Sequence, residues 1–79
     1  RLQTSFNIYP NPFNDYLIIE QADLGTVNIE IIDINGKALI SKAVSGLRIK
    51  IETNNLPSGL YLVKVYFDDK IRTSLVVKE

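Results

Sequence analysis

The chain has 79 residues, no net charge, and neither cysteine nor histidine. Its length predicts one small domain, and the missing residue types exclude disulfides, thiol catalysis and histidine-based acid–base or metal chemistry. Because its nine basic side chains are balanced by nine acidic ones, the chain also lacks the positive field that holds nucleic acid or anionic lipid.

The apolar composition favours strands over helices. The chain contains eleven Ile, six Val, four Tyr and three Phe but only three Ala, and β-branched and aromatic residues fit the pleated surface of a sheet. No apolar run approaches the roughly 20 residues needed to span a bilayer, and we expect no secretory leader within these 79 residues. Since the chain begins with Arg1 and not with methionine, we expect a fragment, or a mature or excised domain, of a longer protein.

The first two expected strands, 5–9 and 15–20, flank the segment Tyr9-Pro10-Asn11-Pro12-Phe13-Asn14-Asp15. Proline donates no backbone hydrogen bond, so this segment cannot lie inside a helix or a central strand. We expect a crossover at a sheet edge, where prolines block unwanted pairing, with Phe13 capping the core. The alternative is that the same stiff segment presents a surface to a protein partner.

Two further strands, 26–34 and 37–43, are expected on either side of Asn35-Gly36. Asn-Gly between alternating runs favours a hairpin with a type I′ turn, which needs positive φ at both central residues. Asp33 also resembles the first ligand of a calcium loop, but Val44 stands where the glutamate of that loop belongs. We therefore favour a plain hairpin over an ion site.

Three strands, 47–52, 60–67 and 70–78, complete the expected seven. Leu56-Pro57-Ser58-Gly59 is a typical turn sequence, whereas Asp68-Asp69 is a weaker one because it lacks glycine. Alternation over 47–52 is strict. In the last strand, the period of two assigns one face to the core, consisting of Ile71, Thr73, Leu75 and Val77.

Short strands with frequent turns predict an all-β, immunoglobulin-like sandwich of about seven antiparallel strands in two sheets. Tyr61 is expected to be a core tyrosine whose hydroxyl binds nearby backbone, as the corner tyrosine of such sandwiches does. The residues expected to form the core are Val27, Ile29, Ile31, Ile49, Ile51, Tyr61, Val63, Val65 and Leu75.

No catalytic, cofactor-binding or metal site is expected. No pair of carboxylates lies in a sequence context that would raise the pKa of one partner and leave the other ionised. Ser58-Gly59 lacks the G-x-S-x-G frame of a serine hydrolase. We therefore expect that the domain is not an enzyme.

Four sequence features in a fixed order resemble the C-terminal sorting domain (type A) of the bacterial type IX (Por) secretion system, found in the Bacteroidetes lineage. The resemblance runs from about Phe6 to Glu79 and departs from the family at Asp68-Asp69, where a glycine is common. The four features are Pro10-Asn11-Pro12, then Asp33 with Gly36, then Leu56, Gly59 and Tyr61, and finally the lysine-bearing last strand with Lys70 and Lys78.

The resemblance implies a C-terminal secretion signal. Such a domain follows a cargo enzyme or adhesin in the same chain, and the cargo first enters the periplasm through its own N-terminal signal. The domain then directs the cargo through the outer-membrane translocon to the cell surface or the extracellular space. A sortase-like cysteine protease usually removes the domain, often while joining the cargo to a surface lipopolysaccharide.

The alternative function is an immunoglobulin-like accessory module that binds carbohydrate or spaces the domains of a secreted enzyme or adhesin. A carbohydrate-binding face calls for exposed Trp or stacked Tyr. The chain has no Trp, and its four tyrosines, Tyr9, Tyr16, Tyr61 and Tyr66, are not expected on one surface. The sorting function is therefore preferred.

Two segments are expected to carry the sorting function. The flexible linker and processing region consists of Arg1, Leu2, Gln3, Thr4 and Ser5, ahead of the sandwich at 6–79. The last strand is expected at a sheet edge, where a partner strand can pair with it. The residues expected to face the translocon are Lys70, Arg72, Ser74, Val76 and Lys78. The alternative role of Arg72 and Lys78 is to discourage aggregation at that edge.

Overall fold

The computed structural model describes residues 6–22, 25–67 and 69–79. Every expected strand is present, and its ends lie within two residues of the expected ones. The strands are β1 (Phe6–Tyr9), β2 (Tyr16–Gln21), β3 (Thr26–Ile32), β4 (Ala38–Ser45), β5 (Arg48–Glu52), β6 (Gly59–Phe67) and β7 (Lys70–Lys78). No helix of the described residues is long and apolar enough to cross a membrane.

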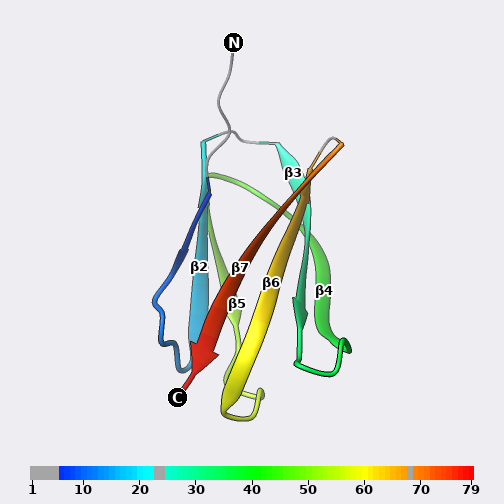
Figure 1. The fold of residues 1–79 in the computed structure, drawn as a ribbon. Coiled ribbons are helices and arrows are strands. Elements are labelled where there is room, and N and C mark those ends of the chain that lie inside the picture. The colour runs from blue at the N-terminus through cyan, green and yellow to red at the C-terminus, as the bar shows by residue number, and fades with distance from the viewer. Residues whose placement is uncertain (1–5, 23–24, 68) are drawn as a thin grey trace.

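The strands form two antiparallel sheets (Figure 1). One sheet has the order β1-β2-β5 and the other the order β4-β3-β6-β7, so β7 lies at a sheet edge, as expected. The expected all-β, immunoglobulin-like sandwich is confirmed. Phe6 contacts Phe67, with ring centroids 4.9 Å apart, and Lys78 pairs with Gly59. The described chain therefore starts at one end of the sandwich and stops at the other.

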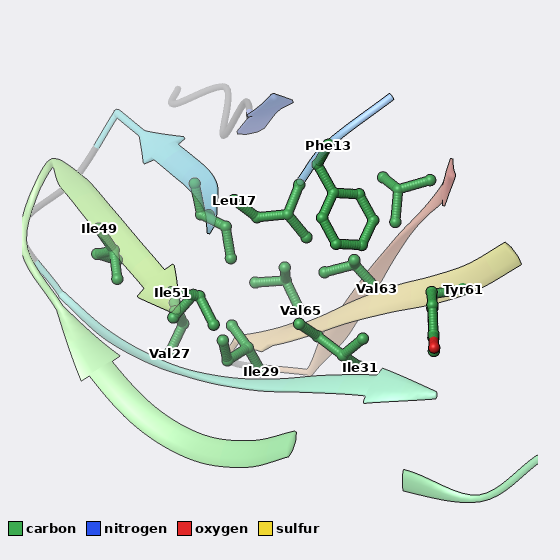
Figure 2. Close-up of a cluster of buried hydrophobic side chains, with 12 residues drawn as sticks. Phe13, Leu17, Val27, Ile29, Ile31, Ile49, Ile51, Tyr61, Val63 and Val65 are labelled. Atoms are coloured by element: carbon green, nitrogen blue, oxygen red, sulfur yellow. The ribbon is translucent and has the colours of Figure 1, made fainter. Parts of the chain in front are cut away.

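The core lies between the two sheets, and every second residue of β3, β5 and most of β6 points into it (Figure 2). Eight of the nine expected core residues are buried, and Phe13 closes one end of the core as expected. The buried apolar residues that the expected core omitted are Leu17, Ile18, Ile19 and Val76.

The expected orientation of the last strand is wrong. Leu75 is 58% exposed, whereas Val76 is fully buried. Val76 is the Cα partner of Tyr61 on β6. Because the side chains of such partners lie on the same face of an antiparallel sheet, and Tyr61 is buried, the Val76 side chain also points into the core. Sequence alternation failed because Leu75-Val76-Val77 is apolar on both faces. The register that starts from the Phe67–Lys70 pair decides which face is buried.

The β3–β4 hairpin is confirmed, but its turn differs from the expected two-residue one. Asp33 N donates to Lys37 O, which leaves a three-residue loop, and Gly36 N donates to Asp33 O. Gly36 has a φ of 87°, in the left-handed region that favours glycine. The Asp33 carboxylate also accepts hydrogen bonds from the backbone N–H groups of Asn35 and Lys37. This side chain stabilises the longer loop and accounts for the difference.

Leu47 differs from the expected alternation over 47–52. Its side chain is 50% exposed, although Ile49 and Ile51 are buried. Strand β5 begins only at Arg48, and Leu47 lies in the bend that follows Gly46, whose φ is 117°. The bend takes Leu47 out of the strand, so strand alternation does not extend to it.

Candidate functional site: the C-terminal strand and its edge

The segment that contains the two closely spaced prolines crosses from β1 to the outer edge of β7. Phe13 N donates to Val77 O at 2.8 Å, and Glu79 N donates to Phe13 O at 3.0 Å. Phe13 thereby forms an isolated parallel bridge with Lys78. The peptide bonds Tyr9–Pro10 and Asn11–Pro12 are cis. The expected edge crossover is therefore present, and the edge that it covers belongs to the C-terminal strand.

Asn11 extends this contact with its side chain. Its Nδ2 donates to Leu75 O at 3.1 Å, and its Oδ1 accepts from Val77 N at 3.0 Å. One side-chain amide thus satisfies a donor and an acceptor that a neighbouring strand would otherwise use. We call residues Asn11–Phe13 the clasp, because they cover the edge of β7 from Leu75 to Glu79.

The side chain of Lys78 packs inside the sandwich, at the same end as the clasp. It is buried, its Nζ donates to Thr53 O at 2.8 Å, and Nζ lies 5.8 Å from the centre of the Phe13 ring. Thr53 in turn donates through N to Asp15 O and through Oγ1 to Asn14 O. The sequence did not predict this role of Thr53, although the residue continues the period of two that buries Ile49 and Ile51, because it is polar and lies just beyond the end of the expected strand.

The expected translocon-facing residues do not form one exposed row. Lys70 and Arg72 are exposed and Ser74 is half-buried, but Val76 and Lys78 are buried. The expectation that the side chains of Val76 and Lys78 face a partner is therefore wrong. The outward face of β7 instead carries Ile71, Thr73, Leu75 and Val77, which were expected in the core.

Three further residues of the family features, Leu56, Gly59 and Tyr61, stabilise the turn that precedes β6. Buried Tyr61 donates its hydroxyl to Pro57 O at 2.6 Å, which confirms the expected bond to nearby backbone. Burial raises the pKa of Tyr61, and the negative charge of Asp33 raises it further. Leu56 N donates to Thr53 O, and β6 begins at Gly59, whose φ is 149°. These contacts order the chain that leads into β6.

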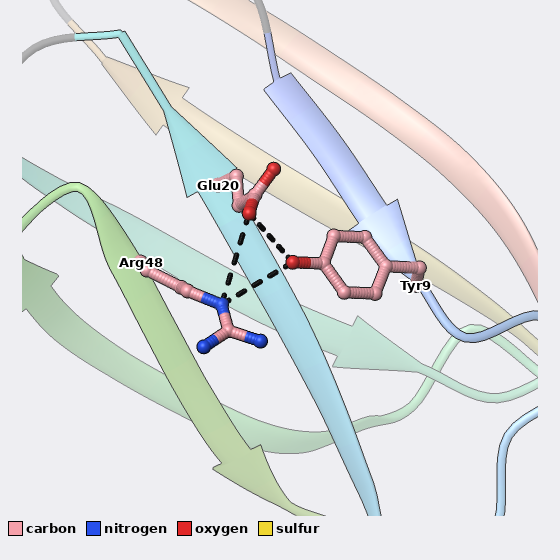
Figure 3. A network of polar contacts seen from close by, with 3 residues as sticks. All are labelled: Tyr9, Glu20 and Arg48. Carbon is pink, nitrogen blue, oxygen red and sulfur yellow. Dashed lines mark hydrogen bonds and ion pairs between the residues drawn. The ribbon is translucent and has the colours of Figure 1, made fainter.

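The outer face of the three-stranded sheet carries charged side chains that are paired with one another. The Tyr9 hydroxyl donates to Glu20 at 2.6 Å and accepts from Arg48 Nε at 3.3 Å, and Arg48 also lies 3.7 Å from Glu20 (Figure 3). The hydrogen bond to Tyr9 is the main cause of the raised pKa of Arg48. Beside this network, Lys50 Nζ lies 5.0 Å from the centre of the Tyr16 ring.

The four tyrosines are divided among different parts of the molecule. Tyr9 and Tyr16 lie on the outer face of the three-stranded sheet, Tyr61 is in the core, and Tyr66 lies on the opposite outer face, bonded to Glu30. They form no common aromatic surface of the kind that a carbohydrate-binding module needs. Among residues 6–22, 25–67 and 69–79, no group of three or more acidic side chains is placed to hold a metal ion.

Two expectations fall on residues outside the described ranges. The expected processing region at 1–5 lies there entirely, and so does Asp68, which was expected in the turn before the last strand.

The family model described as the secretion system C-terminal sorting domain matches residues 7–79, which is nearly the whole chain. No curated protein matches the chain.

Proposed function

This chain belongs to the family of secretion system C-terminal sorting domains, and we propose that it carries a cargo domain of the same chain through the type IX outer-membrane translocon. The cargo precedes Arg1 and reaches the periplasm by a separate signal. After translocation a sortase-like protease removes the domain, and the cargo is released or anchored at the cell surface. The domain itself supplies binding surfaces and no catalytic group.

One structural observation supports this proposal most directly. The C-terminal strand lies at a sheet edge, and its last residues are at the opposite end of the sandwich from Phe6. A cargo joined ahead of Phe6 therefore leaves the end formed by the clasp and the last residues of β7 unobstructed. This arrangement allows the translocon to contact the domain while the cargo is still attached.

The proposal is tested by asking whether the domain causes export of a protein that is not normally exported. Residues 1–79 are fused to the C-terminus of an inert fluorescent reporter that carries a periplasmic signal, and the fusion is produced in a type IX-competent host. We expect the reporter at the cell surface or in the medium, measured by protease accessibility of intact cells. A folded fusion that stays in the periplasm of that host contradicts the proposal.

Processing gives a second readout of the same fusion. We expect cleavage within or just before Arg1 to Ser5, because this mostly polar segment precedes the first strand of the sandwich. Mass spectrometry of the exported reporter locates the new C-terminus. A cleavage site inside the sandwich, or export without any cleavage, contradicts the proposed processing region.

A further inference from the structure

Apolar side chains gather at one end of the outer face of the four-stranded sheet, while Ile71 and Tyr66 form a separate pair toward its other end. At the first of these ends two cross-strand pairs, Leu60 with Val77 and Leu62 with Leu75, lie side by side on the solvent face. Leu75 is 58% exposed, and Ile34 in the neighbouring β3–β4 turn is 77% exposed. The next outward pair along the hairpin, Lys64 with Thr73, is polar. The apolar side chains thus form a bounded patch.

The patch contains a shallow hollow. Its volume is about 230 Å³, and it is lined by Asp33, Ile34, Leu60, Tyr61, Leu62 and Leu75. An exposed apolar patch that is rimmed by polar residues is a candidate site for a protein partner. A hollow of this size fits one large apolar side chain of a protein partner.

Among the described residues, no second strand pairs with the edge of β7 beside the patch over part of its length. Val77 directs its backbone N–H and C=O away from β6 and toward the clasp. Because backbone direction alternates along a strand, Thr73 and Ile71 direct theirs away from β6 as well. Within the described residues, β6 is the only strand that pairs with Ile71 and Thr73. The open edge therefore ends at Leu75, where the clasp begins.

We propose that the open edge of β7 and the adjoining patch together bind a short extended segment of a protein of the secretion machinery. The segment pairs with Ile71 and Thr73 as an added strand. It cannot continue along the edge past Leu75, because Asn11 and Phe13 occupy those backbone groups. The segment then turns onto the outer face and places one apolar side chain in the hollow. This inference rests on the proposed sorting function and names the surface that performs it.

Two observations select an extended protein segment as the occupant. A row of backbone donors and acceptors is complementary to another strand, and alternate side chains of that strand then meet the outward row of β7. The patch lies at the end of the sandwich away from Phe6, as Figure 1 shows for the β3–β4 turn, the start of β6 and the end of β7. A cargo domain joined ahead of Phe6 is therefore not the natural occupant.

The first experiment tests strand pairing through Thr73, in the reporter fusion described above. Thr73→Pro removes an outward N–H that β6 does not use, so the melting temperature should fall by about 5 °C or less. Surface export should nevertheless drop at least about fivefold, because one or two backbone hydrogen bonds to the partner are lost. Thr73→Ala is the matched control, since it keeps the N–H, and it should be exported like the parent.

The second experiment tests the hollow. Leu75→Asp should lower export at least about fivefold through loss of apolar contact with the partner. Leu47→Asp is the matched control, because Leu47 is 50% exposed but lies outside the patch. A photo-crosslinking residue at position 75, and not at position 47, should give an adduct with a secretion-system protein during export.

The outcomes separate this inference from the proposed function. If the parent fusion is exported and the folded Thr73→Pro and Leu75→Asp variants are exported equally well, the docking surface is wrong and the sorting function stands. If the parent fusion is not exported at all, the sorting function itself fails. An adduct between two copies of the domain, in place of one with a secretion-system protein, also overturns the proposal.

Discussion

Lys78 illustrates what one side chain does at the C-terminal end of the domain. Its ammonium group donates to Thr53 O and lies near the face of the Phe13 ring, so it connects β7 to the segment after β5 and to the clasp. A long side chain can bury its methylene stem while its charged end keeps a hydrogen bond. Lys78 therefore contributes to the stability of the fold. Its replacement should lower the free energy of unfolding, whether or not a partner binds at this end.

The corresponding prediction compares two lysines of β7. Lys78→Glu should lower the free energy of unfolding by about 2–4 kcal/mol, because it places a carboxylate beside the Thr53 carbonyl in a buried position. Lys70→Glu, at an exposed position of the same strand, should cost about 1 kcal/mol or less. Urea denaturation followed by circular dichroism measures both. Equal costs would contradict the structural role of Lys78.

The clasp explains why the β7 edge is closed over one part and open over another. Prolines suit an edge because their missing N–H groups break no ladder, and Asn11 and Phe13 supply the hydrogen bonds that a strand would supply. Residues at opposite ends of the chain thus share one structural element. The motif at Pro10-Asn11-Pro12 lies beside the last strand because the Asn11 side chain binds the backbone of β7, and Phe13, which follows the motif, exchanges backbone hydrogen bonds with Val77 and Glu79.

We therefore expect Asn11→Ala to destabilise the domain by about 1–2 kcal/mol, since two hydrogen bonds to β7 are lost. Amide hydrogen exchange at Val77 should become faster, because its N–H loses the Asn11 acceptor. Asn7→Ala, at an exposed position of β1, is the control and should change the stability by about 0.5 kcal/mol or less. Unchanged exchange at Val77 in the Asn11 variant would contradict the clasp.

The whole molecule is a small two-layer sandwich that depends on one core. Side chains of both sheets meet between the layers, and the core residues with the least exposure come from β2, β3, β5, β6 and β7 and from Phe13 of the clasp. A 79-residue chain buries only roughly 60% of its unfolded surface, so its stability is marginal. A change in this shared core therefore affects every surface of the domain, including the edge of β7.

Substitutions in the core should consequently be costly. Val63→Ala should lower the free energy of unfolding by about 1–4 kcal/mol, because Val63 is fully buried between the sheets. Leu75→Ala should cost about 0.5 kcal/mol or less, since Leu75 points to solvent. Chemical denaturation of the two variants measures the difference. A larger cost for Leu75→Ala than for Val63→Ala would reverse the observed orientation of β7.

The sequence by itself determined the number and order of the strands, the two-sheet class and most of the core. Residues such as Val27, Ile29 and Ile31 alternate with polar ones, so the period of two assigns the buried face without knowledge of any neighbour. The motif residues likewise allowed the sorting domain to be identified from sequence, and the family match over 7–79 confirms it.

Only the tertiary structure decided the orientation of β7 and the role of the clasp. The run Leu75-Val76-Val77 is compatible with either face, and pairing of Val76 with Tyr61 selects one. The contact of Asn11 with Leu75 and Val77 joins residues that are 64 and 66 positions apart. No local pattern encodes such a contact, because it depends on how the two sheets bring distant backbone groups within hydrogen-bonding distance.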